Sequence, residues 1–524
     1  MADILSRLPV ECRALVLLNV ELEDLGRTQQ VSKGWGTITR GYLRGYGRTD
    51  HLPPYWQPTK LPGATDFKKD RRIKKAVVKY AERRRMLDGR ASSCRRYKCM
   101  SMFGADYLLS NTGKYLAWVS SNGDVCWQDL TPLPDGQLNR ISSVVTAAAY
   151  GAMGGQFLSV NSDGVLHTRL FPGHEDVVVN LGTGAVLWNS GASTHTECFL
   201  ALGRRYIYLG CSGASLLGPD WGEITAQKIW DGPSWDGFCR VPITHKNTAN
   251  SFIARQGNRP GPFRQPEVLV TFHWVQAAPL SPTWNPAGII LIDGQTGAIL
   301  QTIPLSFFLG RVKLIPCPDN DSEFAVISET KVTDPHYFCR IEKFTFDRDT
   351  DLWKNISVEI LDAGPRPPLL NNDGHIGDMD IEPWRYVAVV LNARRASARR
   401  PFDPYPLSRP FMAEIKFGPA PGNPPALPNN HQVPAGAQQL HLVRKGPIRL
   451  PGLRAARKGR RDFKPGNGLG KRRKCRVAFC GGNHVLLWDE RFNEQVLFDF
   501  GPRRRIDMGM AANPNPNPNT LEER

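Results

Sequence analysis

The sequence lacks the features that mark membrane, secreted and fibrous proteins. No apolar run approaches the ~20 residues that a membrane helix needs, and the opening residues, Met1 to Arg7, lack the apolar core of a secretory signal. Cysteine is scarce, with 11 in 524 residues, so we expect mostly reduced thiols and no disulfide framework. A hydrophobic fraction of 41% excludes a wholly disordered chain. We therefore expect a soluble protein of the cytoplasm, the nucleus or both, with no membrane association.

Motifs that carry catalysis are also missing. The sequence has no His-Glu-x-x-His and no Gly-x-Ser-x-Gly, and the run Gly466 to Lys471 lacks the leading glycine of a phosphate loop. Cys94 with Cys99 and Cys475 with Cys480 share one spacing, but a strand between the last two would point them to opposite faces. We predict a non-catalytic protein with no metal site and no cofactor.

The formal net charge of +18 comes from two short stretches. Lys68 to Lys98 has 14 Lys and Arg against three acids, and Arg444 to Arg476 has 14 against one. The rest of the chain is mildly acidic, so the charge does not favour nucleic acid as a partner of the main domain. In the first stretch, an apolar stripe at helical spacing predicts a connecting helix with a solvated basic face. The alternative is a surface for an acidic partner or phosphate. The stripe consists of Ile73, Val77, Tyr80 and Ala81.

The second basic stretch is rich in Gly and Pro and has little periodicity, which predicts a disordered loop. Two basic clusters separated by about ten residues resemble a bipartite nuclear import signal. The alternative is a solvated, charged loop that no import receptor or other partner binds. The clusters are Arg457, Lys458, Arg460 and Arg461, followed by Lys471, Arg472, Arg473 and Lys474.

The N-terminal residues predict three short helices. Pro9 suits a first helical position, and the segment Val10 to Val20 is apolar on two faces, so one face needs a partner. The segment Glu21 to Leu25 begins a second helix with acids in its first turn. Ser32 is a candidate N-cap of a third helix.

In identity and spacing these residues resemble the F-box, of the fungal type in which a WD40-like domain follows. The matching residues are Leu8-Pro9-x-Glu11, Val16, Val20, Asp24-Leu25 and Val31-Ser32-Lys33-x-Trp35. The resemblance implies binding to a Skp-type adaptor and, through it, to a cullin-RING ubiquitin ligase. Gly34 and Gly36 depart from the pattern and weaken the third helix. The alternative is a helical cap packed on the domain behind it. The resemblance assigns seven residues to the adaptor surface or the module core without separating the two roles: Leu8, Pro9, Val16, Val20, Leu25, Val31 and Trp35.

From about Gly104 the sequence predicts many short antiparallel strands. Apolar runs separated by turn residues indicate hairpins over 115–127, 156–170, 177–188, 288–303 and 484–500. So many hairpins favour a β-propeller-like domain of six to eight blades, because radial repetition protects strand edges. A pair of sandwiches or another repeat fold is the alternative.

We therefore predict a mainly β protein with a small α N-terminal module. The predicted parts are an F-box-like helical module over 1–48, a basic linker with a helix over 49–103, a β-propeller-like domain over 104–418, a disordered insertion over 419–475, a final propeller hairpin over 476–507 and a disordered tail over 508–524. The predicted function is the substrate-recognition subunit of a Skp-cullin-F-box type E3 ubiquitin ligase, with an unknown protein as substrate. The alternative is a propeller scaffold, or a nucleic-acid-associated binding protein, with an unused helical cap.

Overall fold

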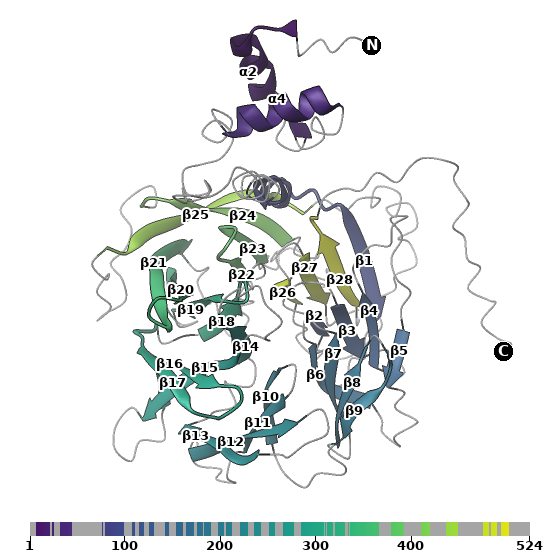
Figure 1. The fold of residues 1–524 in the computed structure, drawn as a ribbon, viewed down its shortest axis with the longest axis vertical. Helices are drawn as coiled ribbons and strands as arrows, with labels where there is room; N and C mark the ends of the chain where they lie inside the picture. Colours follow the sequence, from purple (N-terminus) through teal and green to yellow (C-terminus); the bar gives the residue numbers. More distant parts are fainter. Residues whose placement is uncertain are drawn as a thin grey trace, which may run out of the picture.

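The fold is taken from a computed structural model of the chain, in which a β-sheet ring carries a small helical module at one side (Figure 1). The structure describes residues 7–20, 24–25, 32–44, 76, 79–98, 107–109, 115–119, 125–129, 142–145, 154–160, 164–171, 175–181, 183–189, 197–203, 206–211, 221–228, 235–242, 251–256, 266–276, 284–308, 310, 312–317, 320–330, 334, 336–365, 379–391, 410–419, 436–448, 475–480, 484–489 and 494–501.

Asp24 and Leu25 are helical, and three longer helical segments among the described residues precede the sheets. They are α2 (Val10–Leu18), α4 (Lys33–Arg44) and residues 79–87, which we call the linking helix. Pro9 is the N-cap of α2, one position earlier than predicted. No helix among the described residues is both long and apolar enough to cross a bilayer.

Five sheets have four strands each. The first contains β2 (Tyr107–Leu109), β3 (Tyr115–Val119), β4 (Val125–Asp129) and β5 (Ser142–Val145). The second contains β6 (Gly154–Val160), β7 (Val165–Phe171), β8 (Glu175–Asn180) and β9 (Val186–Asn189). The third contains β10 (Glu197–Leu202), β11 (Tyr206–Cys211), β12 (Trp221–Lys228) and β13 (Trp235–Pro242). The fourth contains β14 (Phe252–Arg255), β15 (Glu267–Gln276), β16 (Trp284–Asp293) and β17 (Ile299–Pro304). The fifth, which closes the ring, contains β1 (Ser93–Lys98), β28 (Glu494–Asp499), β27 (His484–Asp489) and β26 (Cys475–Cys480) in that order.

The remaining sheet has eight strands and consists of two antiparallel four-stranded halves. One half contains β18 (Val312–Pro316), β19 (Glu323–Glu329), β20 (His336–Asp347) and β21 (Leu352–Pro365). The other contains β22 (Met379–Glu382), β23 (Val387–Leu391), β24 (Pro410–Phe417) and β25 (Gln438–Pro447). A short parallel pairing between β21 and β25 joins the halves at their outer strands.

Hydrophobic cores lie between neighbouring sheets around the ring. The strand β16 shows how one strand serves two of them. Ile289 and Leu291 pack into the core shared with β18–β20, and Ile290 and Ile292 pack into the core shared with β10, β11 and β13. Successive side chains of a strand point to opposite faces, so a stretch packed between two sheets is apolar at consecutive positions, as Ile289 to Ile292 are. The unbroken apolar run of β16 is therefore what a sheet packed on both faces requires, and the sheets follow one another around a common centre (Figure 1).

The five predicted hairpins are confirmed as β3–β4, β6–β7, β8–β9, β16–β17 and β27–β28. Two predicted boundaries are wrong. The predicted linker over 49–103 contains β1, which pairs with β28 and completes the closing sheet. The predicted disordered insertion over 419–475 contains β25, which pairs with β24 and β21. Both are outermost strands of their four-stranded units. Their sequences are polar and basic and carry no long apolar run, so composition hid them. The tail over 508–524 lies outside the described residues.

Candidate docking surface

The helix α2 buries Leu17 and leaves four large apolar side chains in water, spread around much of the rest of its circumference. Leu17 is fully buried in the core of the helical module. Leu15, Val16 and Leu18 are 60%, 41% and 43% exposed, and Val10 at the start of the helix is 65% exposed. Large apolar side chains scattered singly on a surface are ordinary, but four on a nine-residue helix are a surplus of exposed apolar surface that a partner would cover.

The helix α4 holds α2 in place. Its first turn is capped as the sequence predicts, because the amide of Trp35 donates to the Ser32 hydroxyl over 3.1 Å. Tyr42 and Leu43 of α4 pack with Leu17 and Leu25 in the module core. The buried Leu25 lies between the two helices in the chain, so α2 and α4 form one small packed unit.

The linking helix belongs to two cores at once. Near its start, Ala81 is buried in the module core, with Tyr80 packed beside it. At its end, Met86 and Leu87 are buried between the β22–β25 half-sheet and the closing sheet. The predicted docking through Tyr80 and Ala81 is confirmed, and Ile73 and Val77 lie outside the described residues. The helical module is therefore attached to the ring by packing as well as by chain connectivity.

Buried ion pairs join the linking helix to the ring. The Arg83 guanidinium is 2% exposed; it donates to the Arg385 carbonyl and pairs with the Glu414 carboxylate, both at 2.9 Å. A second pair connects the same two parts: Arg385, in the turn between β22 and β23, lies 3.2 Å from Glu82 of the linking helix. The predicted solvated basic face is thus wrong for Arg83 and also for Arg85, which is buried. The Glu414 carboxylate, 331 positions away in the chain, offsets part of the cost of burying Arg83.

The structure shows which of the seven predicted F-box residues lie in the module core and which face solvent. Leu25 is buried, and Leu8, Val20 and Trp35 are half-buried against the module core. Val16 and Pro9 face solvent. Val31 lies outside the described residues. Leu15, Leu18 and Val10 extend the exposed apolar surface and were not among the predicted residues, although their apolar character on a second face of the helix was the available signal.

Other predicted sites are only partly visible. All eight residues of the possible import signal, between Arg457 and Lys474, lie outside the described residues, as does Cys99. Cys94 is half-buried beside the core under the linking helix. Cys475 and Cys480 occupy opposite ends of β26. Among the side chains that the structure describes, no three metal-binding groups lie together.

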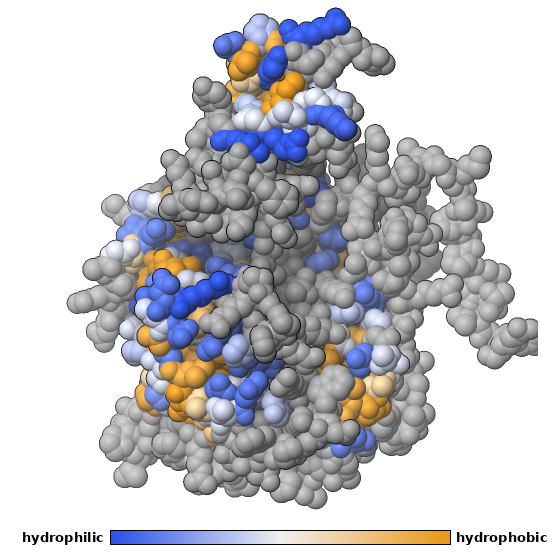
Figure 2. Space-filling model, in the orientation of Figure 1, coloured by the Kyte–Doolittle hydropathy of each residue, from blue (hydrophilic) through white to orange (hydrophobic). Residues whose placement is uncertain are grey.

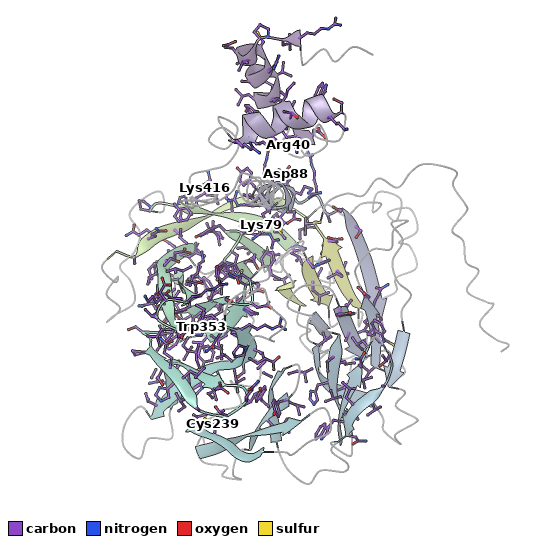
Figure 3. All side chains as sticks on the ribbon, viewed as in Figure 1. Arg40, Lys79, Asp88, Cys239, Trp353 and Lys416 are labelled. Atoms are coloured by element: carbon purple, nitrogen blue, oxygen red, sulfur yellow. The ribbon has the colours of Figure 1, made fainter. Side chains whose placement is uncertain are left out.

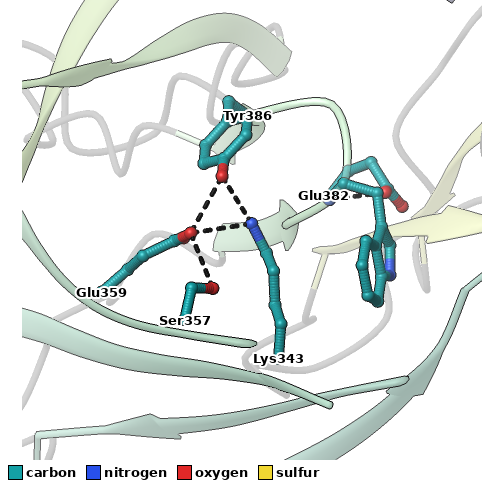
Figure 4. A network of polar contacts seen from close by, with 6 residues as sticks. Lys343, Ser357, Glu359, Glu382 and Tyr386 are labelled. Carbon is teal, nitrogen blue, oxygen red and sulfur yellow. Dashed lines mark hydrogen bonds and ion pairs between the residues drawn. The ribbon is translucent and has the colours of Figure 1, made fainter. Parts of the chain in front are cut away.

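A buried polar cluster, which the sequence did not reveal, lies where the two halves of the eight-stranded sheet meet (Figure 4). The Lys343 ammonium donates to Glu359 Oε1 over 2.9 Å and to the Tyr386 hydroxyl over 2.7 Å, and that hydroxyl lies 2.9 Å from the same carboxylate oxygen. Burial lowers the pKa of Lys343, and the nearby charge of Glu359 opposes that shift. The Lys343 and Glu359 side chains are almost wholly buried, so the cluster joins two half-sheets and presents no binding surface.

Comparison with known proteins assigns no family. No family profile matches the sequence, and no curated protein matches it. Among solved structures, a chain of the crystal structure of the mitotic checkpoint complex is 9% identical, with a TM-score of 0.39 over 77% of this chain and 90% of that one. The Myceliophteria thermophila Cps50 (Swd1) β-propeller domain is also 9% identical, with a TM-score of 0.36 over 78% of this chain and 99% of that one. Hydrazine synthase of Kuenenia stuttgartiensis is 11% identical, with a TM-score of 0.37 over 75% and 94%.

Proposed function

We propose that this chain is a non-catalytic substrate-recognition subunit of a Skp-cullin-F-box type ubiquitin ligase. The helical module binds the Skp-type adaptor, and the ring holds a target protein. The observation that carries the proposal is the exposed apolar surface of α2, to which Val10, Leu15, Val16 and Leu18 contribute. It lies on the module whose residues resemble an F-box, and it is the surface that a helix-binding adaptor would cover.

The exposed area of α2 is large enough to matter for binding. Complete burial of a Val or Leu side chain is worth about 1.5–3 kcal/mol. Side chains that are half exposed at the start have about half of that left, so the four together supply about 4 kcal/mol. A micromolar complex needs about 8 kcal/mol beyond the cost of association, so this surface supplies part of the binding energy and cannot supply it alone. Neighbouring polar contacts would supply the rest.

The ring is proposed as the target-binding part. Counting each half of the eight-stranded sheet as one unit, the described sheets make a propeller of seven blades in our proposal. The parallel pairing of β21 with β25 then joins two neighbouring blades at their outer strands. Loops between strands of such a ring can vary without disturbing the cores, which suits recognition of a specific target.

The linking helix gives the proposed mechanism its geometry. Its residues pack both in the module core and between two sheets of the ring, so an adaptor on α2 has a set position relative to a target on the ring. Catalysis then depends on holding the target close to the ubiquitin-charged enzyme, and no residue of this chain takes part in the chemistry.

The test is co-purification of the full chain with a Skp-type adaptor. We expect Leu15→Glu with Val16→Glu to abolish adaptor recovery, because two charges would enter an apolar contact. The matched control is Leu352→Glu with Ile356→Glu, two equally exposed apolar residues of β21 on the ring. Failure of the unaltered chain to recover the adaptor, or equal recovery by both variants, would contradict the proposal.

The second candidate is a propeller scaffold associated with nucleic acid, favoured by the two stretches of net charge +11 and +13. It predicts that nucleic acid is enriched with the purified chain and is released steeply as salt rises. It also predicts that the α2 variant and its control behave alike.

A further inference from the structure

Exposed cations form a band across the junction between the helical module and the ring. On α4, Lys33, Arg40 and Arg44 are exposed, and their spacing of seven and four residues places them on one side of the helix. The opposite side carries Tyr42 of the module core and Trp35, which packs against that core. α4 contains no acidic residue. It therefore presents a stripe of positive charge about 16 Å long at 1.5 Å per residue.

The band continues onto the linking helix and the ring. Arg84 and Arg90 are exposed beside the buried Arg83. Arg83 pairs with Glu414 of β24, and two residues further along β24 Lys416 is exposed. Figure 3 labels Arg40, Lys79 and Lys416 at this junction. We call Lys33, Arg40, Arg44, Arg84, Arg90 and Lys416 the basic belt.

Few acids oppose the belt. On α4 and residues 79–91, Asp88 is the exposed acid among the side chains that the structure describes. Glu82 is buried and pairs with Arg385, and Glu414 is mostly buried and lies 2.9 Å from Arg83 and 3.9 Å from Lys416. The sequence just before the linking helix, 68–75, adds six further Lys and Arg against Asp70. Positive potential from so many like charges extends beyond the surface and attracts an acidic partner.

We propose that the basic belt is a docking surface for an acidic segment of the target protein. This inference rests on the proposed function, in which the ring binds a target protein, and it adds that the target carries an acidic segment. The belt differs from the exposed apolar surface of α2 in character, and Figure 2 shows hydrophilic side chains on the module where it approaches the ring, with apolar ones further away.

The arrangement favours an acidic polypeptide over nucleic acid. Binding of single strands uses aromatic rings on which bases stack. The aromatic residues of α4, Trp35 and Tyr42, are instead packed in or against the module core. Among its described residues the belt thus offers cations without an aromatic stacking surface, which suits carboxylates along a polypeptide.

The test measures binding of a labelled short polyglutamate peptide by fluorescence anisotropy. The full chain is used with its basic residues between 457 and 474 replaced by glutamine, so that this stretch does not compete. We expect Arg40→Glu with Arg84→Glu to weaken binding about tenfold at low salt, since each exposed pair is worth up to about 1 kcal/mol. Arg40→Gln with Arg84→Gln should fall between. The matched control, Arg348→Glu with Lys354→Glu, reverses two exposed cations at the β20–β21 turn and should bind as before.

Two results would overturn the inference. One is equal affinity of the belt and control variants, with thermal unfolding showing that both are folded. The other is tighter binding of an oligothymidylate than of polyglutamate. The peptide-binding measurements do not contain the adaptor, so they are independent of the pull-down. Loss of adaptor binding would contradict the proposed function alone, and loss of peptide binding would contradict the basic belt alone.

Discussion

Replacing Arg83 by methionine should loosen the linking helix from the ring. The side chain is almost wholly buried and makes two contacts of 2.9 Å, one with the Arg385 carbonyl and one with the Glu414 carboxylate. Removing one partner of a buried pair costs about 3–5 kcal/mol. We expect the lower end, about 3 kcal/mol, because Glu414 keeps a more distant cation, Lys416, at 3.9 Å.

The assay is hydrogen exchange of the backbone amides of residues 79–87, which reports local opening without requiring two-state unfolding of the whole chain. A loss of about 3 kcal/mol corresponds to exchange faster by about a hundredfold. Adding Glu414→Leu to Arg83→Met should recover most of the protection, because the uncompensated buried charge is then gone. The neighbouring Arg84 is exposed, so Arg84→Met should change stability by less than about 0.5 kcal/mol. Unchanged exchange in the single variant, or equally fast exchange in the double variant, would refute the reasoning.

Two further predictions concern buried charges of the ring. The pKa of Lys343 is lowered from 10.5, chiefly by burial, so the unfolded chain binds that proton more readily. The free energy of unfolding of the unaltered chain in urea should therefore increase as pH rises through the interval just below 10.5. The Lys343→Met variant should lack this increase. The same pH dependence of stability in both chains would contradict the prediction. Asp380 accepts from Lys313 Nζ over 2.7 Å and from the Phe479 amide over 2.8 Å, which links three strands. Asp380→Asn should speed exchange of the Phe479 amide by about tenfold, and an unchanged rate there would show that this contact does not hold the strands together.

Local patterns were enough to predict the hairpins and the helix cap. The β16–β17 hairpin follows from an apolar run, an Asp-Gly turn and a second run, all within about 16 residues, because strand period and turn geometry are properties of neighbouring residues. The Ser32 cap is equally local, since donor and acceptor lie three residues apart. The surplus of apolar surface on α2 could also be predicted, because too many positions are apolar for one buried face.

The sequence by itself thus determined the strand-rich class, the positions of the ten strands in five hairpins and the presence of a small helical unit with surplus apolar surface. Only the tertiary structure decided that β1 and β28, nearly 400 residues apart, share the closing sheet, and that β25 runs parallel to β21. It also decided that Arg83 is buried and Arg84 exposed. These outcomes depend on partners such as Glu414 and Arg385, which the packing of the sheets brings to Arg83. The residues next to Arg83 in the chain carry no pattern that would predict those partners.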